Sequence, residues 1–249
     1  MPDSFVNGSM SSPFTHPDVV RALFAGVVPR YDLMNTLMTL GLHSRWRRKT
    51  AQKAIPIPLT DPWVLDLGCG TGDLALAMAR RCPSARVVGV DPVVPMLTSA
   101  VRKARRAGVG GRFLPLAGDG LALPFPSAVF AACACAFVLR NTPDPSAVLR
   151  EMGRVLVPGG RLAVLELCQF ERTIPERAVA WYLRRVVPLL GRWVTGHGEA
   201  YTYFARSVEA FPTPKGLATW VLGAGFTQVE WRRLAPGVAL VWGVWPGVA

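Results

Sequence analysis

The spacing of hydrophobic and polar positions changes along this chain, and this spacing predicts its strands and helices. From residue 63 onward, short apolar runs alternate with stretches whose apolar positions recur at helical spacing. The apolar runs predict buried strands at Trp63–Leu67, Arg86–Val90, Arg112–Leu116, Val129–Ala136 and Arg161–Leu167. The stretches between them, as at 94–107 and 144–156, predict helices. Strands separated by such helices indicate an α/β fold, with a parallel sheet covered on both faces.

The two ends of the chain follow other patterns. Residues 1–16 are small and polar, and we expect a disordered tail there. Residues 17–58 predict an N-terminal helical cap, in which Asn35 or Thr36 caps one helix and Ser44 caps the next. The main domain is expected over 59–249, with a helical insertion at about 170–212. The runs 226–234 and 238–244 predict a C-terminal antiparallel hairpin.

The first predicted strand ends in a loop rich in glycine. Gly68, Gly70 and Gly72 occupy alternate positions just before a helical pattern that begins at Leu74. Such a turn directs backbone N–H groups and the positive end of a helix at one small concavity, where glycine lets a ligand touch the backbone. The spacing matches neither the dinucleotide fingerprint nor the phosphate loop that ends in Gly-Lys-Ser/Thr. We therefore expect another kind of nucleotide site, with an ordinary tight turn as the alternative.

Acidic residues accompany the first three predicted strands. Asp91 follows the glycine loop by about twenty residues, where a carboxylate accepts both ribose hydroxyls of a nucleoside or, alternatively, caps the next helix. Asp119 could meet an adenine edge, although Gly118-Asp-Gly120 is also an ordinary turn. Asp66 is expected to be nearly buried, either to hold the glycine loop or to receive an ammonium group.

Composition narrows the class of protein. The chain has 249 residues and a net charge of +12, which indicates either attraction to an anionic surface or a solvated, arginine-rich surface. The basic residues are dispersed and lack an aromatic platform, so we expect no nucleic-acid partner. Five cysteines without C-x-x-C spacing predict a reducing, cytoplasmic compartment, no disulfide framework and no metal site. No secretory signal is visible, and the longest apolar stretch is too short to cross a bilayer.

Several segments together resemble one enzyme family. They are Tyr31-Asp-Leu-Met-Asn35, Gly41-Leu-His-Ser-Arg-Trp-Arg-Arg48, Val64-Leu-Asp-Leu-Gly-Cys-Gly-Thr-Gly-Asp-Leu74 and Leu139-Arg-Asn141. Over about residues 19–243 the chain is similar to the C-methyltransferases of demethylmenaquinone and ubiquinone biosynthesis. The resemblance implies a class I S-adenosylmethionine-dependent methyltransferase with a Rossmann-like, mostly parallel, seven-stranded sheet. It implies methyl transfer to a ring carbon of a polyprenylated quinol, foremost demethylmenaquinol. Methylation of another aromatic molecule at carbon or oxygen is the alternative.

The resemblance also implies a set of cofactor residues. By position, Thr71, Asp91, Asp119 and Gly120 contact S-adenosylmethionine, and Ala136 does so through its backbone. The same site is expected to include Asp66, Gly68 and Gly70. Three positions depart from the family pattern: Ala131 replaces an acid, Val241 replaces a histidine, and Val138 replaces a glycine. We expect Val138 to place a bulkier side chain near the substrate.

Methylation of a quinol ring needs a group near its hydroxyl and a field that favours phenolate. Arg140, at the end of the fourth predicted strand, is expected to stabilise the phenolate, and Asn141 to orient the ring hydroxyl. His43 is the alternative base, and Tyr31, Asn35 and Tyr201 are expected to line the substrate pocket. The competing interpretations are a salt bridge for Arg140 and a packed or capping role for His43.

The polyprenyl tail of such a substrate resides in the bilayer. The N-terminal helices and residues 178–194, with Pro188 among them, are candidates for a tail channel and for peripheral contact with an anionic membrane at its inner face. Burial against the sheet or in a homodimer interface is the alternative.

Overall fold

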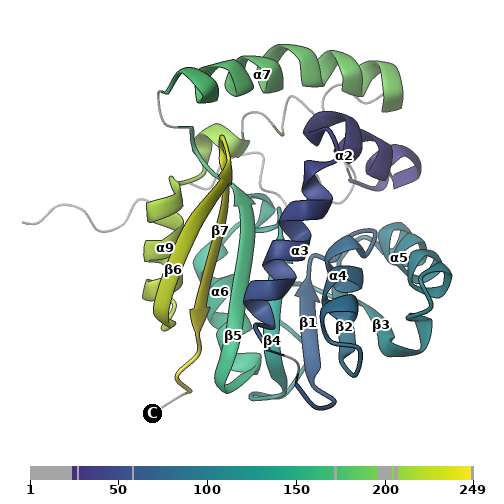
Figure 1. Ribbon diagram of the computed structural model, residues 1–249, viewed down its shortest axis with the longest axis vertical. Coiled ribbons are helices and arrows are strands. Elements are labelled where there is room, and N and C mark those ends of the chain that lie inside the picture. The colour runs from purple at the N-terminus through teal and green to yellow at the C-terminus, as the bar shows by residue number, and fades with distance from the viewer. Residues whose placement is uncertain are drawn as a thin grey trace, which may run out of the picture.

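Seven strands form one mixed sheet at the centre of the molecule (Figure 1). The computed structural model describes residues 24–26, 28–57, 59–170, 173–195, 204 and 207–247. The sheet has the order β3-β2-β1-β4-β5-β7-β6, with strands β1 (Trp63–Leu67), β2 (Arg86–Asp91), β3 (Phe113–Ala117), β4 (Phe130–Ala136), β5 (Leu156–Leu167), β6 (Thr227–Ala235) and β7 (Val238–Val244). β1 to β5 are parallel, and β7 lies antiparallel between β5 and β6. The predicted fold class is confirmed, C-terminal hairpin included.

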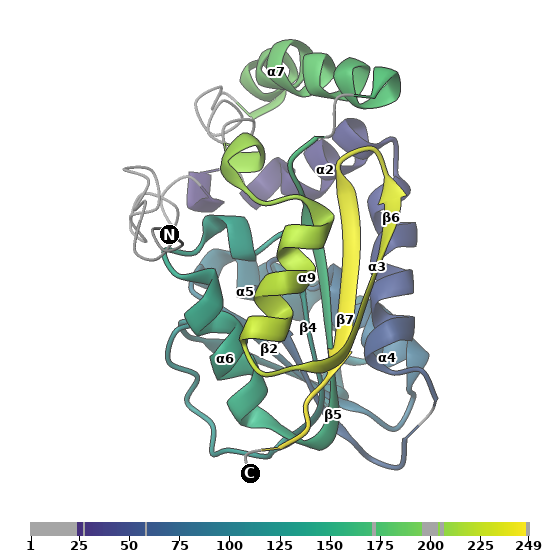
Figure 2. The same ribbon diagram turned by 90° about the vertical axis from the view of Figure 1, so that its left-hand side faces the viewer.

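Helices cover both faces of the sheet and enclose two apolar layers. One face carries α3 (Leu42–Ala54), α4 (Asp73–Arg81) and α5 (Val94–Arg106), and the other carries α6 (Pro145–Val155) and α9 (Pro214–Gly223) (Figures 1 and 2). Short 3-10 helices are η2 (Gly110–Arg112) and η3 (Leu139–Asn141). Successive residues of a strand point to opposite faces, so Val64 packs in the first layer and Leu65 in the second. Because both faces are covered, the central strands β1 and β4 are mostly apolar rather than alternating, whereas the edge strand β6 is polar and largely exposed.

Two further helices lie across the carboxyl ends of the parallel strands. They are α2 (Tyr31–Thr39), preceded by the 3-10 helix η1 (Val28–Arg30), and α7 (Ile174–Thr195) (Figures 1 and 2). Met34 of α2 packs with Leu183 and Val187 of α7 in a third apolar cluster. The predicted helix over 178–194 is confirmed, and it contains Pro188. Ligands of open α/β sheets bind at this end of the strands.

Some predicted boundaries are wrong. α2 begins at Tyr31, so Asn35 and Thr36 lie inside it, and Gly41 rather than Ser44 precedes α3. Burial of Met34 in the first turn of α2 outweighs the local cap preferences. β5 begins at Leu156 and contains the Pro-Gly-Gly segment 158–160, which bulges because its pairing with β4 skips to Arg161.

The predicted tail, residues 1–16, lies outside the described residues. α3, within the predicted cap, packs on the sheet, and Trp46, Ala51 and Ala54 belong to the core. All five cysteines are buried and free. Within the described ranges, no helix combines the length and apolarity needed to cross a bilayer.

Candidate active site

A cavity of about 140 Å³ lies at the carboxyl ends of β1, β2 and β4, and we call it the cofactor cavity. Parallel strands end at one edge of a sheet, so residues far apart in the sequence meet there. The predicted cofactor residues that line it are Gly68, Gly70, Asp91, Asp119, Gly120 and Ala136. The sequence-based grouping of these six positions agrees with their placement.

Asp91 ties the glycine loop to the end of β2. Its Oδ2 accepts the N–H of Gly70 and its Oδ1 accepts the N–H of Val93, each at 2.8 Å. Burial raises the pKa of Asp91 above its ordinary value, against the effect of these two N–H groups. Each carboxylate oxygen has a second lone pair, so Asp91 can still accept two hydroxyls from the cavity. The Val93 bond lies just before α5, as expected of an acid at the start of a helix, and acceptance of the ribose hydroxyls by Asp91 stays a prediction.

Bare backbone and one bulky neighbour shape the glycine loop. Gly70 has a φ of +52°, and a Cβ there would meet no atom within 4 Å, so the open space belongs to the cavity. Gly68 has a φ of +62°, and a Cβ there would overlap the Val138 side chain.

Asp66 supplies an unpaired acceptor beside the loop. Its side chain is 1% exposed, and Oδ2 finds no hydrogen-bond partner among the described residues. Burial raises the pKa of Asp66 to about 8. Together with Gly68, Gly70 and Thr71 it lines a small polar recess next to the cofactor cavity. A cation in this recess would restore the ionised carboxylate, which fits the ammonium group of an amino-acid moiety.

A second cavity, of about 390 Å³, lies between α2, α3, α7 and the ends of β4 and β5, and we call it the acceptor cavity. Most of its wall is apolar. The predicted residues that line it are Tyr31, Asn35, His43, Arg140 and Asn141. Tyr201, also predicted here, lies outside the described residues. Tyr31, Phe137 and Asn141 line both cavities, so the two sites adjoin.

Val138 lines the cofactor cavity and is absent from the wall of the acceptor cavity. Because the two cavities adjoin, the expectation that it lies near the substrate stays a prediction. Phe137, the residue before it, is left-handed (φ +64°), turns the chain after β4 and directs the Val138 side chain toward Gly68.

Arg140 forms a buried ion pair at the acceptor cavity. Its Nη1 donates to Glu166 Oε1 at 2.6 Å, and Glu166 is completely buried in β5. Burial raises the pKa of Glu166, although Arg140 and the Leu167 N–H favour its ionised form. Arg140 Nε is buried without a partner among the described residues. Arg140 is thus both salt-bridged and part of the cavity wall, and its charge is largely balanced by Glu166.

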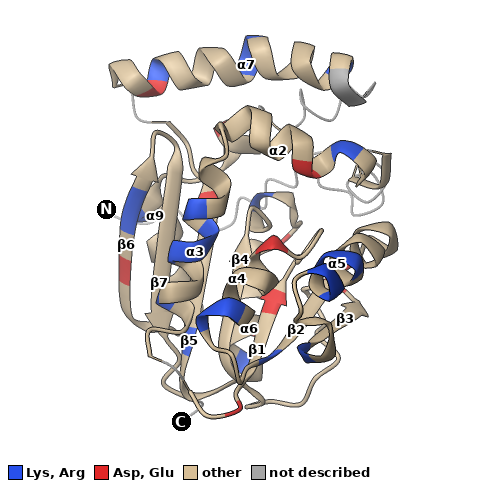
Figure 3. Ribbon diagram, turned by 45° about the vertical axis from the view of Figure 1, so that its right-hand side comes forward, with Lys and Arg blue, Asp and Glu red and all other residues tan. Residues whose placement is uncertain are grey.

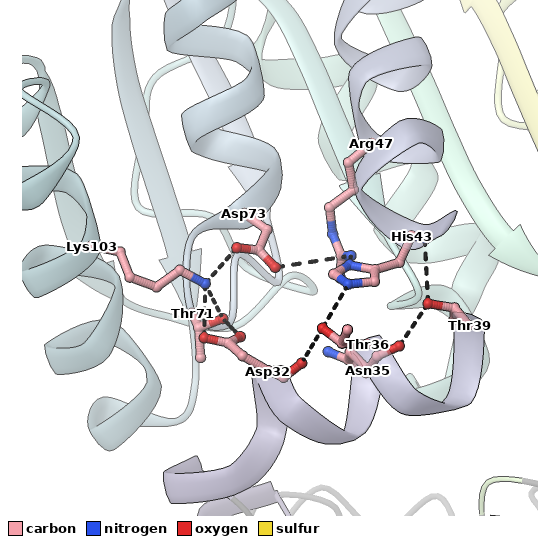
Figure 4. Close-up of polar contacts among 9 residues, drawn as sticks. All are labelled: Asp32, Asn35, Thr36, Thr39, His43, Arg47, Thr71, Asp73 and Lys103. Atoms are coloured by element: carbon pink, nitrogen blue, oxygen red, sulfur yellow. Dashed lines mark hydrogen bonds and ion pairs between the residues drawn. The ribbon is translucent and has the colours of Figure 1, made fainter. Parts of the chain in front are cut away.

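His43 is held neutral by its neighbour one turn along α3. Arg47 Nη1 lies 2.6 Å from His43 Nδ1 (Figure 4). Arginine only donates, so Nδ1 accepts and the ring proton sits on Nε2, 3.3 Å from Thr36 Oγ1. Burial and the charge of Arg47 lower the pKa of His43. Both ring nitrogens are therefore engaged, and a role as base requires His43 to release one of these contacts.

Phe137 separates the two cavities in a strained conformation. Its φ of +64° is rare for a bulky residue. The Leu165 carbonyl accepts its N–H at 2.8 Å, and Asn141 Nδ2 donates to its carbonyl at 3.1 Å. The guanidinium carbons of Arg47 and Arg140 lie 5.5 and 5.9 Å from its ring centroid. Asn141 therefore fixes the partition between the cavities as well as lining both.

Thr71, predicted as a cofactor contact, takes part in a polar cluster that sequence reasoning missed. Its Oγ1 donates to Asp32 Oδ1 at 2.6 Å and accepts from Lys103 Nζ at 3.1 Å (Figure 4). Asp32 is 39 positions away in the sequence and Lys103 is 32 positions away, so no local signal connects them. Glu166, which lies 26 positions from Arg140, was missed for the same reason.

The sheet, the glycine loop, Asp91 and the adjoining cavities define a class I S-adenosylmethionine-dependent methyltransferase. Within that class the chain belongs to the ubiE/COQ5 methyltransferase family, whose model matches residues 14–245. It is 43% identical to the demethylmenaquinone methyltransferase of Thermus thermophilus, over 88% of this chain and 97% of that protein. It is 40% identical to the demethylmenaquinone methyltransferase of Deinococcus radiodurans, over 90% of each.

Solved structures show the same fold at low sequence identity. A putative O-methyltransferase of Nostoc punctiforme matches with a TM-score of 0.65 and 18% identity, over 89% of this chain and 60% of that one. A chain from the complex of the Haloferax volcanii Trm112 methyltransferase activator with a putative methyltransferase matches with a TM-score of 0.64, also at 18% identity, over 90% and 98%. These likenesses support the fold alone.

Proposed function

We propose that this enzyme transfers the methyl group of S-adenosylmethionine to a ring carbon of a polyprenylated quinol, converting demethylmenaquinol to menaquinol. Two kinds of observation support this. The relatives from Thermus and Deinococcus carry that activity in their names. The acceptor cavity is large, mostly apolar and adjoins the cofactor cavity, as an aromatic ring with a hydrocarbon tail requires.

The observation that carries the proposal is a pair of buried donors on the wall of the acceptor cavity. Asn35 Nδ2 and Arg140 Nε both lack an acceptor among the described residues. A buried donor without a partner costs about 1–3 kcal/mol, so a ligand that supplies acceptors recovers this energy. A hydroquinone carries two oxygens on an otherwise apolar ring. We assign one oxygen to each donor, which leaves the ring carbons facing the partition at Phe137.

Catalysis then depends on the position of the acceptor ring relative to the methyl group and on a hydrogen-bond donor directed at the phenolate oxygen. S-adenosylmethionine, when bound, supplies a methyl group already activated by its sulfonium. Asp91 would hold the ribose, Asp66 the ammonium group, and Tyr31 and Phe137 the acceptor ring beside the cofactor cavity. Arg140 stabilises the phenolate through its Nε–H rather than through net charge, because Glu166 balances its guanidinium. The increased electron density at the ring carbon favours its attack on the methyl group. The bond between sulfur and methyl breaks, S-adenosylhomocysteine is the leaving group, and the methylated carbon then loses its ring proton to water, which restores the aromatic ring.

Incubation of the purified enzyme with S-adenosylmethionine and chemically reduced demethylmenaquinone tests the proposal. Mass spectrometry should show the gain of one methyl group. Mild oxidation of the product should regenerate a quinone absorbance, because carbon methylation leaves both hydroxyls free. A product that resists oxidation would indicate oxygen methylation, and no methylation of the quinol would refute the proposal.

We further propose peripheral contact with an anionic bilayer through α7, which would deliver the tail. The helix exposes large apolar side chains at Ile174 (84%), Trp181 (62%), Leu189 (65%) and Trp193 (92%). Exposed arginines accompany them on the same helix, at positions 177, 184, 185 and 192 (Figure 3). Tryptophan with arginine on one exposed face is typical of interfacial helices. The inner membrane face as location and the homodimer stay predictions.

A further inference from the structure

A cluster of polar side chains joins α2 to the glycine loop, α4 and α5 (Figure 4). Lys103 Nζ of α5 lies 2.9 Å from Asp32 Oδ2 of α2 and 3.1 Å from Thr71 Oγ1 of the loop. Lys103 also contacts Asp73 at the start of α4. The Thr71 hydroxyl donates to Asp32 Oδ1 at 2.6 Å. We call Asp32, Thr71, Asp73 and Lys103 the α2 tie.

Lys103 is the cation that two carboxylates share. Its side chain is 26% exposed, and those of Asp73 and Asp32 are 24% and 47% exposed. Partial burial limits solvent screening, and charge-assisted hydrogen bonds are stronger than neutral ones. Without Lys103, Asp32 and Asp73 would face each other as like charges, while Arg47 would still lie 4.0 Å from Asp73.

Apart from this polar cluster, α2 is anchored by a small apolar contact with α7, in which Met34 is buried and Tyr31 and Met38 are partly buried. Met34 is its one buried residue, and Leu33 and Leu37 are 52% and 38% exposed. A helix of nine residues is too short to be stable without tertiary contacts. The polar tie therefore adds to this small apolar contact in determining where α2 lies.

We propose that Lys103 and Asp32 are positioning residues for methyl transfer, whose ion pair holds α2 against the glycine loop and so places Tyr31 and Asn35 at the acceptor cavity. Asp32 directly follows Tyr31, and Asn35 lies one turn further along the same helix. Neither Lys103 nor Asp32 lines the cofactor or the acceptor cavity, so both act through α2. The choice of acceptor in the test rests on the proposed function.

Steady-state kinetics of Lys103→Met, which removes the cation and keeps an unbranched chain, test the proposal. The KM for demethylmenaquinol should rise about tenfold, the effect of losing charge-assisted hydrogen bonds. The Kd for S-adenosylhomocysteine should change less than this KM, because neither Lys103 nor Asp32 lines the cofactor cavity and only Thr71 and Asp73 of the tie reach the adjoining polar recess. Lys103→Arg should retain a KM near that of the wild type.

Two comparisons separate positioning from a general loss of stability. Arg102→Met is the matched control on α5, because Arg102 bonds Ser99 outside the tie, and its KM should be unchanged. The double variant Asp32→Asn/Lys103→Met should raise KM no more than the worse single variant, since both remove one interaction. An unchanged KM in Lys103→Met, or additive effects in the double variant, would overturn the proposal.

Amide hydrogen exchange provides a readout that needs no acceptor. In Lys103→Met, exchange should accelerate over residues 31–39 and stay unchanged over 145–155 of α6. Unchanged amide exchange over 31–39 would overturn the proposal that Lys103 holds α2. If the wild-type enzyme does not methylate demethylmenaquinol, the proposed function fails, and the exchange measurement still decides whether Lys103 holds α2.

Discussion

At the scale of single residues, Asp66 is the group whose charge responds most directly to the cofactor. Its Oδ2 is buried without a partner among the described residues, and burial raises its pKa to about 8, so the carboxyl is protonated at neutral pH before the cofactor binds. An ammonium group beside it favours the ionised form and lowers that pKa. Cofactor binding and loss of the Asp66 proton are therefore linked.

Calorimetry of S-adenosylhomocysteine binding at pH 7, in buffers of different ionisation enthalpy, should detect release of about one proton in the wild type. Asp66→Asn should abolish this component. The folded-state pKa is raised, so the stability contributed by the protonated carboxyl is lost as pH rises toward about 8. In Asp66→Asn, the free energy of unfolding should therefore fall less between the pKa of the unfolded state, about 4, and the folded-state pKa of about 8. Equal proton release by both proteins would contradict the assignment.

Arg140 combines a structural and a chemical role, and substitutions can separate the two. Arg140→Ala leaves Glu166 buried without its cation, so the free energy of unfolding should fall by about 3–5 kcal/mol. Adding Glu166→Gln removes the buried charge and should recover part of that loss. Turnover should fall at least about 100-fold in both proteins, because the donor to the phenolate is missing in both.

Denaturant unfolding and quinol turnover, measured on the same preparations, check the Arg140 prediction. Full turnover by Arg140→Ala would refute the catalytic role. Recovery of turnover together with stability in the double variant would show that Arg140 acts only as a structural partner of Glu166.

At the scale of elements, α7 divides its surface between two tasks. Leu183 and Val187 pack toward α2, whereas Trp181 and Trp193 are exposed together with arginines. The inward face lines the acceptor cavity through Val179, Tyr182 and Leu183. One helix thus connects the cavity with the surface proposed to meet the bilayer.

Flotation with anionic vesicles at low salt should recover the wild-type protein, and added salt should reduce recovery. Trp181→Ser/Trp193→Ser should lower vesicle affinity about tenfold or more, since each large apolar side chain contributes about 1.5–3 kcal/mol when buried. Trp231→Ser on β6 is the matched control, an exposed tryptophan (42%) away from α7. Unchanged flotation of the α7 variant would remove α7 from the proposed contact.

At the scale of the whole molecule, the cofactor cavity joins five segments that are distant in the sequence (24–31, 67–70, 91–96, 118–120 and 136–148), so ligand binding there should stabilise the entire fold. S-adenosylhomocysteine at about 100 times its Kd should add about 2.7 kcal/mol to the free energy of unfolding. Asp91→Ala should lose most of this gain at the same ligand concentration, because Asp91 holds Gly70 and would bind the ribose. Glu230→Ala on β6 is the control and should keep the gain, as thermal or urea unfolding will show. Equal gains in both variants would contradict the assigned role of Asp91.

Most of the sheet can be predicted from the sequence, because burial on both faces leaves continuous apolar runs in the central strands and the glycine loop has a fixed spacing to Asp91. The start of α2 cannot, because packing of Met34 prevails over the cap preference of Asn35 and Thr36. The start of β5 at Leu156 cannot either, since proline and glycine at 158–160 favour a turn and only pairing with β4 holds them in a bulged strand.

The sequence by itself determined the fold class, the cofactor loop and the residues that resemble a quinol methyltransferase, because these depend on local periodicity and short motifs. Only the tertiary structure decided that Arg140 pairs with Glu166, that Val138 faces the cofactor loop, and that Thr71 joins Asp32 and Lys103. The bonded partners lie 26 to 39 positions apart in the sequence. The orientation of Val138 follows instead from the turn at the preceding residue, Phe137. Such contacts arise from how α2, α5 and the strand ends converge, and no pattern along the chain encodes that convergence.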